Sequence, residues 1–199
     1  MEALIHEKLH EIEKRENCRI LLAVESGSRA WGFASTDSDY DVRFSSPIIY
    51  KTTPFAEQFK PVMRHYFSSK SGLWHYLQMA SGNYRDYLKR DMVKAKKYFY
   101  VLRPILACRW ILDKGTPPPM RFGELMDSQL PDYLKETVKS LLDLKMNSPE
   151  VKEIPRIDML NEYLDESIDE VKALVEQYPK EVMKDWDELN RLFLRALEM

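Results

Sequence analysis

A glycine-serine turn between two short apolar stretches restricts the fold of this 199-residue chain more than any other feature. Residues 19–24 read Arg-Ile-Leu-Leu-Ala-Val, an apolar run typical of a strand that is buried on both faces. Gly27 ends this run, and Ser28 is a good N-cap for a short helix that continues to Trp31. After a turn, a second strand is predicted over 39–44. The order strand, tight turn, short helix and strand predicts an α+β core in this part of the chain.

Two aspartates, Asp39 and Asp41, stand at the start of the second predicted strand. Residues two apart in a strand point to the same face and lie about 7 Å apart along the chain. Their carboxylates can therefore hold one hard cation or a close pair of cations. Backbone N–H groups at Gly27 and Ser28 begin a predicted helix, where phosphate binds readily. Because nucleotidyl transfer relies on positioning and on charge neutralisation by Mg²⁺, the pattern predicts an enzyme of this class. The alternative is a solvated acidic turn beside an ordinary strand.

Other nucleotide- and metal-binding motifs do not fit the same segment. A Walker loop requires Gly-Lys followed by Ser or Thr, whereas Gly32 is followed by Phe33. The spacing G-x-G-x-x-G of a dinucleotide-binding loop does not occur in the chain. The aspartates at 37, 39 and 41 imitate the start of an EF-hand loop, but Val42 replaces its glycine and Ile48 its last glutamate.

His6 and His10 form a further pattern, His-Glu-x-x-His, inside a helix predicted over 3–16. Two such histidines on one helix can bind Zn²⁺, with the glutamate between them as a base. The segment is densely charged along its length. This charge favours a solvent-facing helix over a closed metal site.

From Pro54 to Met199 the hydrophobic spacing is almost entirely helical. The longest predicted helix covers about 93–114, with Pro104 inside it as a kink, and Gly115 ends it. Further helices are predicted at about 55–67, 73–80, 131–146, 158–177 and 180–197. We therefore predict two domains, a nucleotidyltransferase core over residues 1–53 and a helical domain over residues 54–199.

One face of the longest predicted helix is basic and aromatic. Lys96, Tyr100 and Arg103 share this face, and Lys97 adjoins it. Cations placed in this way can bind a triphosphate while Tyr100 stacks on a base, which makes Lys97, Tyr100 and Arg103 candidate nucleotide ligands. The alternative is a core helix whose apolar side carries Phe99 and whose basic side faces water.

Composition and charge exclude several other classes of protein. The apolar share of 44% suffices for a core of ordinary size, and the net charge of −2 gives no overall field that attracts nucleic acid. Cys18 and Cys108 are far apart and form no C-x-x-C motif, which argues against a disulfide framework or a zinc knuckle. No signal peptide and no run of about 18 apolar residues is visible. We expect a soluble cytoplasmic protein that does not bind membranes.

The residues quoted above resemble the polymerase-β-type nucleotidyltransferase superfamily, whose signature is a hydrophobic strand, Gly-Ser and then Asp-x-Asp. Residues 25–33 and 37–43 are similar, more closely, to the predicted nucleotidyltransferases called RlaP-like or YcgL-like. The same holds for residues 96–110 and 115–119. The resemblance implies transfer of an NMP group from an NTP, with Mg²⁺ as cofactor and two ions expected. The family name is associated with RNA repair, so an RNA end is one candidate acceptor.

The resemblance also implies an arrangement of the site. A small mixed β-sheet core would be followed by an all-α domain, and the NTP would bind in the cleft between them. The two aspartates would ligate Mg²⁺ and carry catalysis, while Gly27 and Ser28 would bind the β- and γ-phosphates. Arg29 and Lys97 would add further phosphate contacts.

The chain departs from the family pattern directly after Phe44. The family carries a sizeable segment there, which supplies more of the sheet and a third carboxylate, whereas Phe44 is followed at once by Ser45-Ser46-Pro47. Residues 48–50 are too short to predict a strand, and two strands alone make a marginal sheet. Either the chain carries a deletion, or the sequence omits residues of the protein; we favour the second explanation. A true deletion would favour a non-catalytic nucleotide- or RNA-binding module on the same fold.

Overall fold

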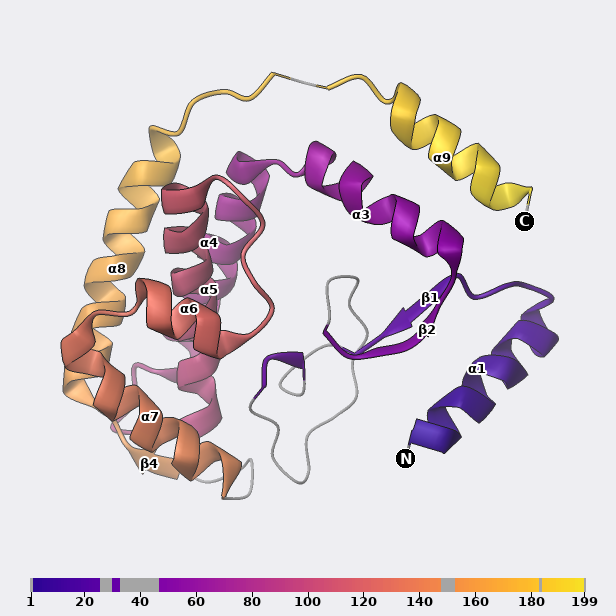
Figure 1. Ribbon diagram of the computed structural model, residues 1–199. Helices are drawn as coiled ribbons and strands as arrows, with labels where there is room; N and C mark the ends of the chain where they lie inside the picture. The colour runs from indigo at the N-terminus through magenta and orange to yellow at the C-terminus, as the bar shows by residue number, and fades with distance from the viewer. Residues whose placement is uncertain (1, 26–29, 33–46, 148–152, 183, 199) are drawn as a thin grey trace.

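The computed structural model describes residues 2–25, 30–32, 47–147, 153–182 and 184–198. The predicted short helix after Gly27 lies largely outside these residues, and the predicted strand over 39–44 lies outside them entirely. The helices and strands of the described residues are drawn in Figure 1: α1 (Glu2–Glu16), β1 (Leu22–Val24), β2 (Ile49–Thr52), α3 (Pro54–Tyr66), α4 (Ser69–Tyr87), β3 (Met92–Lys94), α5 (Ala95–Lys114), α6 (Phe122–Gln129), α7 (Asp132–Met146), β4 (Glu153–Pro155), α8 (Asp158–Glu176) and α9 (Asp187–Leu197).

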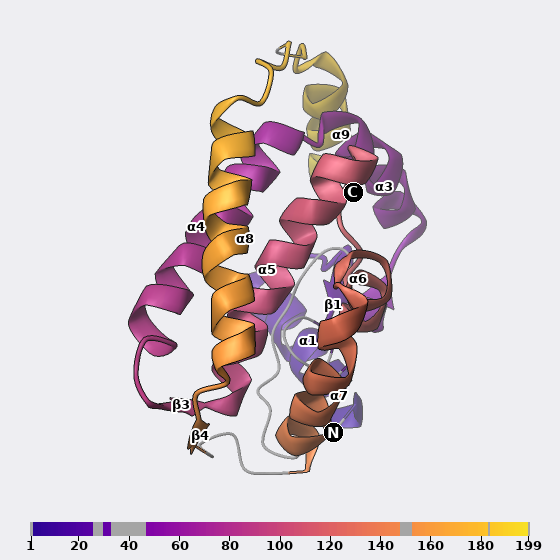
Figure 2. The same cartoon turned by 90° about the vertical axis from the view of Figure 1, so that its left-hand side faces the viewer.

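Helix α5 is the centre of the larger part of the molecule. Twelve of its twenty residues are buried, because α4, α6, α7 and α8 pack around it. The eight successive residues 101–108 are all buried, so this part of the helix depends on neighbours that cover every side of it. Pro104 lies inside the helix as expected, and Gly115 ends it in the left-handed conformation with φ 64°. Figure 2 shows α4, α5 and α8 running side by side.

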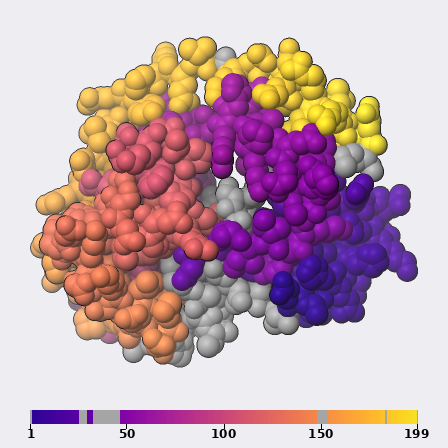
Figure 3. Space-filling view, in the orientation of Figure 1, coloured from indigo at the N-terminus to yellow at the C-terminus, as the bar shows by residue number. Residues whose placement is uncertain are grey.

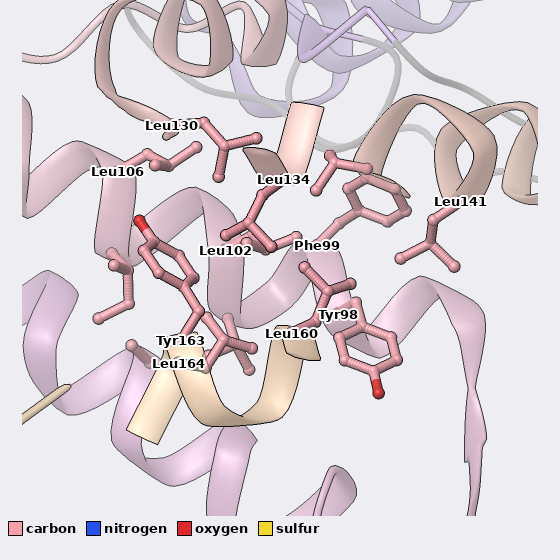
Figure 4. Close-up of a cluster of buried hydrophobic side chains, with 14 of the residues drawn as sticks. Tyr98, Phe99, Leu102, Leu106, Leu130, Leu134, Leu141, Leu160, Tyr163 and Leu164 are labelled. Carbon is pink, nitrogen blue, oxygen red and sulfur yellow. The ribbon is translucent and has the colours of Figure 1, made fainter. Parts of the chain in front are cut away.

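The core of this bundle joins side chains from five helices, α4 to α8. Figure 4 shows them converging on Phe99 and Leu102 of α5. The ring of Phe99 meets that of Phe122 edge to face at a centroid distance of 5.4 Å. Helix α6, which supplies Phe122, was not predicted, because eight residues are too few to show a clear period.

The part of the chain predicted to be all α contains a small sheet. Strand β3 pairs antiparallel with β4, and Val93 lies opposite Ile154. The prediction was therefore wrong here, and helix α5 begins at Ala95 instead of residue 93. A three-residue strand leaves no period in the sequence, and its partner is about sixty residues away. The pairing fixes the start of α5 against the segment before α8.

A second two-stranded sheet lies in the N-terminal part, where β1 pairs antiparallel with β2. Residues 49–52 thus form a strand, although the sequence was judged too short for one, because β1 supplies the missing hydrogen-bond partner. Strand β1 covers three residues instead of the six predicted. Both sheets seen in the described residues are antiparallel, so the predicted mixed sheet is not observed in this part of the structure.

Helix α1 confirms the predicted helix over 3–16, and none of its residues is buried. It lies beside β2, where the Lys51 ammonium contacts the Glu13 carboxylate at 2.6 Å. Figures 1 and 3 show α1, β1 and β2 on one side of the molecule and the helical bundle on the other.

Helix α3 connects these two sides, and α9, near the C-terminus, lies along α3 (Figure 1). Helix α9 packs on α3 through Leu192, and the Arg195 guanidinium contacts the Gln58 amide oxygen at 2.6 Å. The helix predicted over 180–197 begins only at Asp187. Residues before it are held across α3 and α4 instead: the Lys70 backbone N–H donates to the Glu181 carboxylate at 3.0 Å. The division into two domains at residue 53 stays a prediction.

Candidate functional site

A buried carboxylate stands directly before the glycine-serine motif. Glu25 follows β1 and is fully buried, and the Tyr50 hydroxyl donates a hydrogen bond to its carboxylate. Its backbone N–H donates to the Ile48 carbonyl at 2.9 Å, which extends the β1–β2 ladder by one residue. A buried polar group is costly unless it is hydrogen-bonded, so this contact favours the observed position of Glu25 at the end of β1.

A β-bulge places Tyr50 for this contact. Leu22 lies opposite Thr52 and Ala23 opposite Lys51, but Val24 lies opposite Ile49, so Tyr50 is the extra residue. Bulges redirect side chains and are common near functional sites. Sequence reasoning did not find Glu25 and Tyr50 as a pair. The one available signal was a glutamate at the end of an otherwise apolar strand.

Trp31 joins the glycine-serine segment to the helical bundle. Its carbonyl accepts a hydrogen bond from the Phe122 backbone N–H at 2.9 Å, at the start of α6. Its ring meets the edge of the Tyr100 ring at a centroid distance of 6.3 Å. Gly32 has a φ of 89°, which favours glycine, so the chain can turn directly after Trp31. The motif therefore ends against α5 and α6.

Arg103 lies beneath Trp31 and is only 2% exposed. Its guanidinium carbon lies 4.8 Å from the centre of a Trp31 ring, a cation–π contact. The same group points to the carbonyls of Pro119 and Met120 at 3.4 Å. These contacts hold Trp31 and the segment before α6 against α5. The role of Arg103 as a nucleotide ligand stays a prediction.

Lys97 lies between two tyrosine rings. Its ammonium is 3.6 Å from the centre of the Tyr87 ring and 4.7 Å from that of Tyr100. The predicted candidates Lys97, Tyr100 and Arg103 are thus brought together on one side of α5, with Trp31 in contact with two of them. Tyr87 is an additional member that the sequence did not indicate, because it belongs to α4.

A groove of about 450 Å³ opens beside Trp31. Its size falls in the range of about 300–1,000 Å³ that small-molecule sites have. Three segments line it among the described residues: 30–32, Pro47 with Ile48, and Arg121, Gly123, Glu124 and Asp127 around the start of α6. The groove thus lies between the end of the glycine-serine motif and the bundle, and the predicted binding of a nucleotide there stays a prediction.

The remaining predicted site residues, Gly27, Ser28, Arg29, Asp39 and Asp41, lie outside the residues that the structure describes. Their roles stay predictions. Within the described residues, no group of three or more His, Cys, Asp or Glu side chains could hold a metal ion. His6 and His10 on α1 are therefore not part of such a group there. Among the same residues, no helix combines the length and the apolar character that a membrane span requires.

Comparisons with known proteins point to one family. The RlaP profile, described as an RNA repair pathway DNA polymerase beta family, matches residues 1–45 and 44–195. A protein of Bacillus subtilis (strain 168) named "Uncharacterized protein YcgL" is 34% identical over 252 aligned positions, which cover 100% of this chain and 97% of that protein. No solved structure matches the chain.

The family match divides where the sequence departs from the pattern. Its two parts meet at residues 44–45, next to Phe44. The alignment with YcgL spans 252 positions and this chain has 199 residues, so at least 53 positions have no residue here. As one segment, these positions would be enough for several strands and their connections.

Proposed function

Because the chain belongs to the RlaP family of polymerase-β-like proteins, as the resemblance in the sequence predicted, we propose that it transfers an NMP group from an NTP to an acceptor. Asp39 and Asp41 would hold Mg²⁺, with two ions in the complete site, and Gly27 and Ser28 would bind the β- and γ-phosphates. Bound Mg²⁺ would supply neutralisation of the charge on the phosphates during in-line transfer. The proposed setting is the cytoplasm, and the proposed acceptor includes an RNA end.

The docking of Trp31 on α5 is the observation that carries this proposal. Trp31 follows the glycine-serine motif in the sequence, its ring lies 6.3 Å from that of Tyr100, and the Lys97 ammonium lies 4.7 Å from the same Tyr100 ring. Lys97 can then approach a phosphate, and Tyr100 can stack on a base. A cation and an aromatic ring beside a phosphate-binding turn suit a nucleoside triphosphate better than an inorganic anion.

Replacement of both aspartates tests the mechanism. Asp39→Ala with Asp41→Ala should abolish Mg²⁺-dependent transfer of label from an α-³²P-labelled NTP while the far-ultraviolet circular dichroism stays unchanged. Asp169→Ala with Asp187→Ala removes the same charge from two exposed positions of α8 and α9, and should leave transfer intact. Undiminished transfer by the first double variant would refute the metal role.

A second function is favoured by the missing segment. At least 53 positions of the YcgL alignment have no residue in this chain, and the third carboxylate would be among them. In that case the chain binds a nucleotide or RNA without turnover. Calorimetry would then show NTP binding with no release of pyrophosphate. A mass of the purified protein near 23.6 kDa would confirm the shortening, and a mass several kilodaltons larger would restore the expectation of a complete metal site.

A further inference from the structure

The turn from α4 into α5 is strongly basic, in contrast to the rest of the chain. Residues 85–97 contain six lysines and arginines and two aspartates, a local charge of +4, whereas the whole chain carries −2. We call these thirteen residues the basic corner. They include the end of α4, all of β3 and the first turn of α5. Figure 1 places this corner at the end of the bundle that also carries β4.

Acidic groups face three of the six cations. Arg85 contacts Asp86 at 2.9 Å, and Lys89 contacts Asp165 of α8 at 3.3 Å. Lys94 lies opposite Glu153 in the β3–β4 pairing. Arg90 is exposed and forms no ion pair or side-chain hydrogen bond within the described part of the chain. The net charge of the basic corner therefore stays positive when the facing carboxylates of Asp165 and Glu153 are included.

An exposed aromatic ring accompanies these cations. Tyr87 is 43% exposed, which is unusual for a large ring beside a packed helix end. The ammonium of Lys97 lies against it at 3.6 Å and also reaches Tyr100, which in turn meets Trp31. Tyr87, Lys97, Tyr100 and Trp31 thus form a continuous path from the basic corner to the glycine-serine motif.

We propose that the basic corner binds a single-stranded nucleic acid and leads its end along this path to the site of transfer. The inference deepens the proposed function and rests on it for the acceptor role, but not for binding. Cations contact the phosphates, and Tyr87 stacks on a base. In a duplex the bases are already stacked on one another, so an aromatic platform selects unpaired bases. A chain with net charge −2 has no general attraction for nucleic acid, so binding requires a local surface of this kind.

Fluorescence anisotropy with a labelled twelve-nucleotide oligouridine tests this surface, without NTP and without Mg²⁺. Tyr87→Leu should weaken binding about tenfold or more, since one stacked base is lost. The matched control is Tyr133→Leu, which removes an exposed ring from α7 and should leave the affinity unchanged. A twelve-base-pair RNA duplex should bind more weakly than the single strand.

Salt dependence tests the charge separately. Arg90→Gln should reduce the slope of log K against log salt concentration by about 0.7, the value for one phosphate contact on a single strand. The control is Lys172→Gln, which should leave the slope unchanged. Lys172 is an exposed residue of α8 and lies more than one helical turn beyond Asp165, away from the basic corner. Absence of binding at 50 mM salt, equal losses in Tyr87→Leu and Tyr133→Leu, or equal affinity for the duplex would overturn the proposal. These binding assays contain no NTP, so their result does not depend on the transfer assay of the Asp39 and Asp41 variant. Oligouridine binding can be observed even if the proposed transfer activity is refuted, and transfer can be observed even if oligouridine does not bind.

Discussion

Replacing Tyr98 by Phe should reveal how firmly α5 and α8 are joined beneath the candidate site. Tyr98 is fully buried, and its hydroxyl donates to the Asn161 side-chain oxygen at 2.7 Å. The same hydroxyl accepts a hydrogen bond from the Ile157 backbone N–H at 2.8 Å, at the start of α8. The Asn161 amide nitrogen in turn donates to the Leu88 carbonyl at 2.7 Å. One hydroxyl therefore links α5, α8 and the turn between α4 and β3.

Tyr98→Phe removes only the hydroxyl. The loss of stability therefore comes from the Ile157 N–H and the Asn161 side-chain oxygen, which lose their hydrogen-bond partner. A buried donor or acceptor without a partner costs about 1–3 kcal/mol. For the Ile157 N–H and the Asn161 oxygen together we expect a loss of about 2–3 kcal/mol in the free energy of unfolding. In a chain of this size such a loss lowers Tm by roughly 4–12 °C. Urea unfolding followed by circular dichroism should show a lower midpoint with an unchanged m-value.

Two results would refute this reasoning. Tyr133→Phe makes the same chemical change at a residue of α7 that is 64% exposed, and it should alter stability by less than about 0.5 kcal/mol. Equal effects of the two substitutions would show that burial and hydrogen bonding of Tyr98 do not matter. A value for Tyr98→Phe within about 0.5 kcal/mol of zero would do the same.

The pH dependence of this effect has a definite sign. Burial raises the pKa of Tyr98 above its usual value of 10.0, although the Ile157 hydrogen bond and the Arg156 charge act in the opposite direction. Above pH 10 the unfolded chain loses the tyrosine proton while the folded chain keeps it, so unfolding releases a proton. The stability that Tyr98 contributes is complete below pH 10 and falls as the pH rises towards the pKa of the folded state. The difference between the native protein and Tyr98→Phe should therefore shrink above pH 10.

Two further predictions concern the interior. Burial raises the pKa of the Cys108 thiol to about 12, whereas Cys18 is exposed, so a thiol reagent should label only Cys18 until the protein unfolds. A fast reaction that persists in Cys18→Ser would contradict this. Phe99→Ala should cost about 3–5 kcal/mol, because the ring is fully buried, whereas Phe193→Ala on the exposed face of α9 should cost less than about 0.5 kcal/mol. Similar losses at Phe99 and Phe193, measured by urea unfolding, would contradict the described core.

Most helices could be predicted because their own residues determine them. Helix α8 places Leu160, Leu164 and Val171 on one face, and this period is visible without any knowledge of a partner. Helix α5 was found for the same reason, and Gly115 marked its end. Strands β3 and β4 could not be found, since three residues carry no period and depend on pairing between distant segments.

The site shows the same contrast between local and distant information. Helical spacing predicts that Lys96, Tyr100 and Arg103 share one face of α5 and that Lys97 adjoins it, because this grouping depends on local residues alone. The contacts of Tyr100 and Arg103 with Trp31 were not predictable, since they join segments that are far apart in the sequence. The Tyr50 hydroxyl reaches Glu25 only through a one-residue shift in strand register, which no sequence pattern records.

The distribution of buried residues shows which part of the fold depends least on a segment missing after Phe44. The buried residues of the largest core cluster lie between positions 80 and 164, and of the partly buried hydrophobic residues that pack against it, Trp31 alone among those described precedes position 80. A segment missing after Phe44 therefore removes little from this core, and the surface formed by Lys97 and Tyr100 remains. The part of the molecule formed by α1, β1 and β2 is held by far fewer contacts. Helix α1 buries none of its residues, and β1 pairs with β2 over only three positions. The family pattern places more of the sheet and the third carboxylate in the missing segment, directly after the strand predicted over 39–44. A shortened member of this family is thus expected to lose turnover before it loses the binding of nucleotide or nucleic acid.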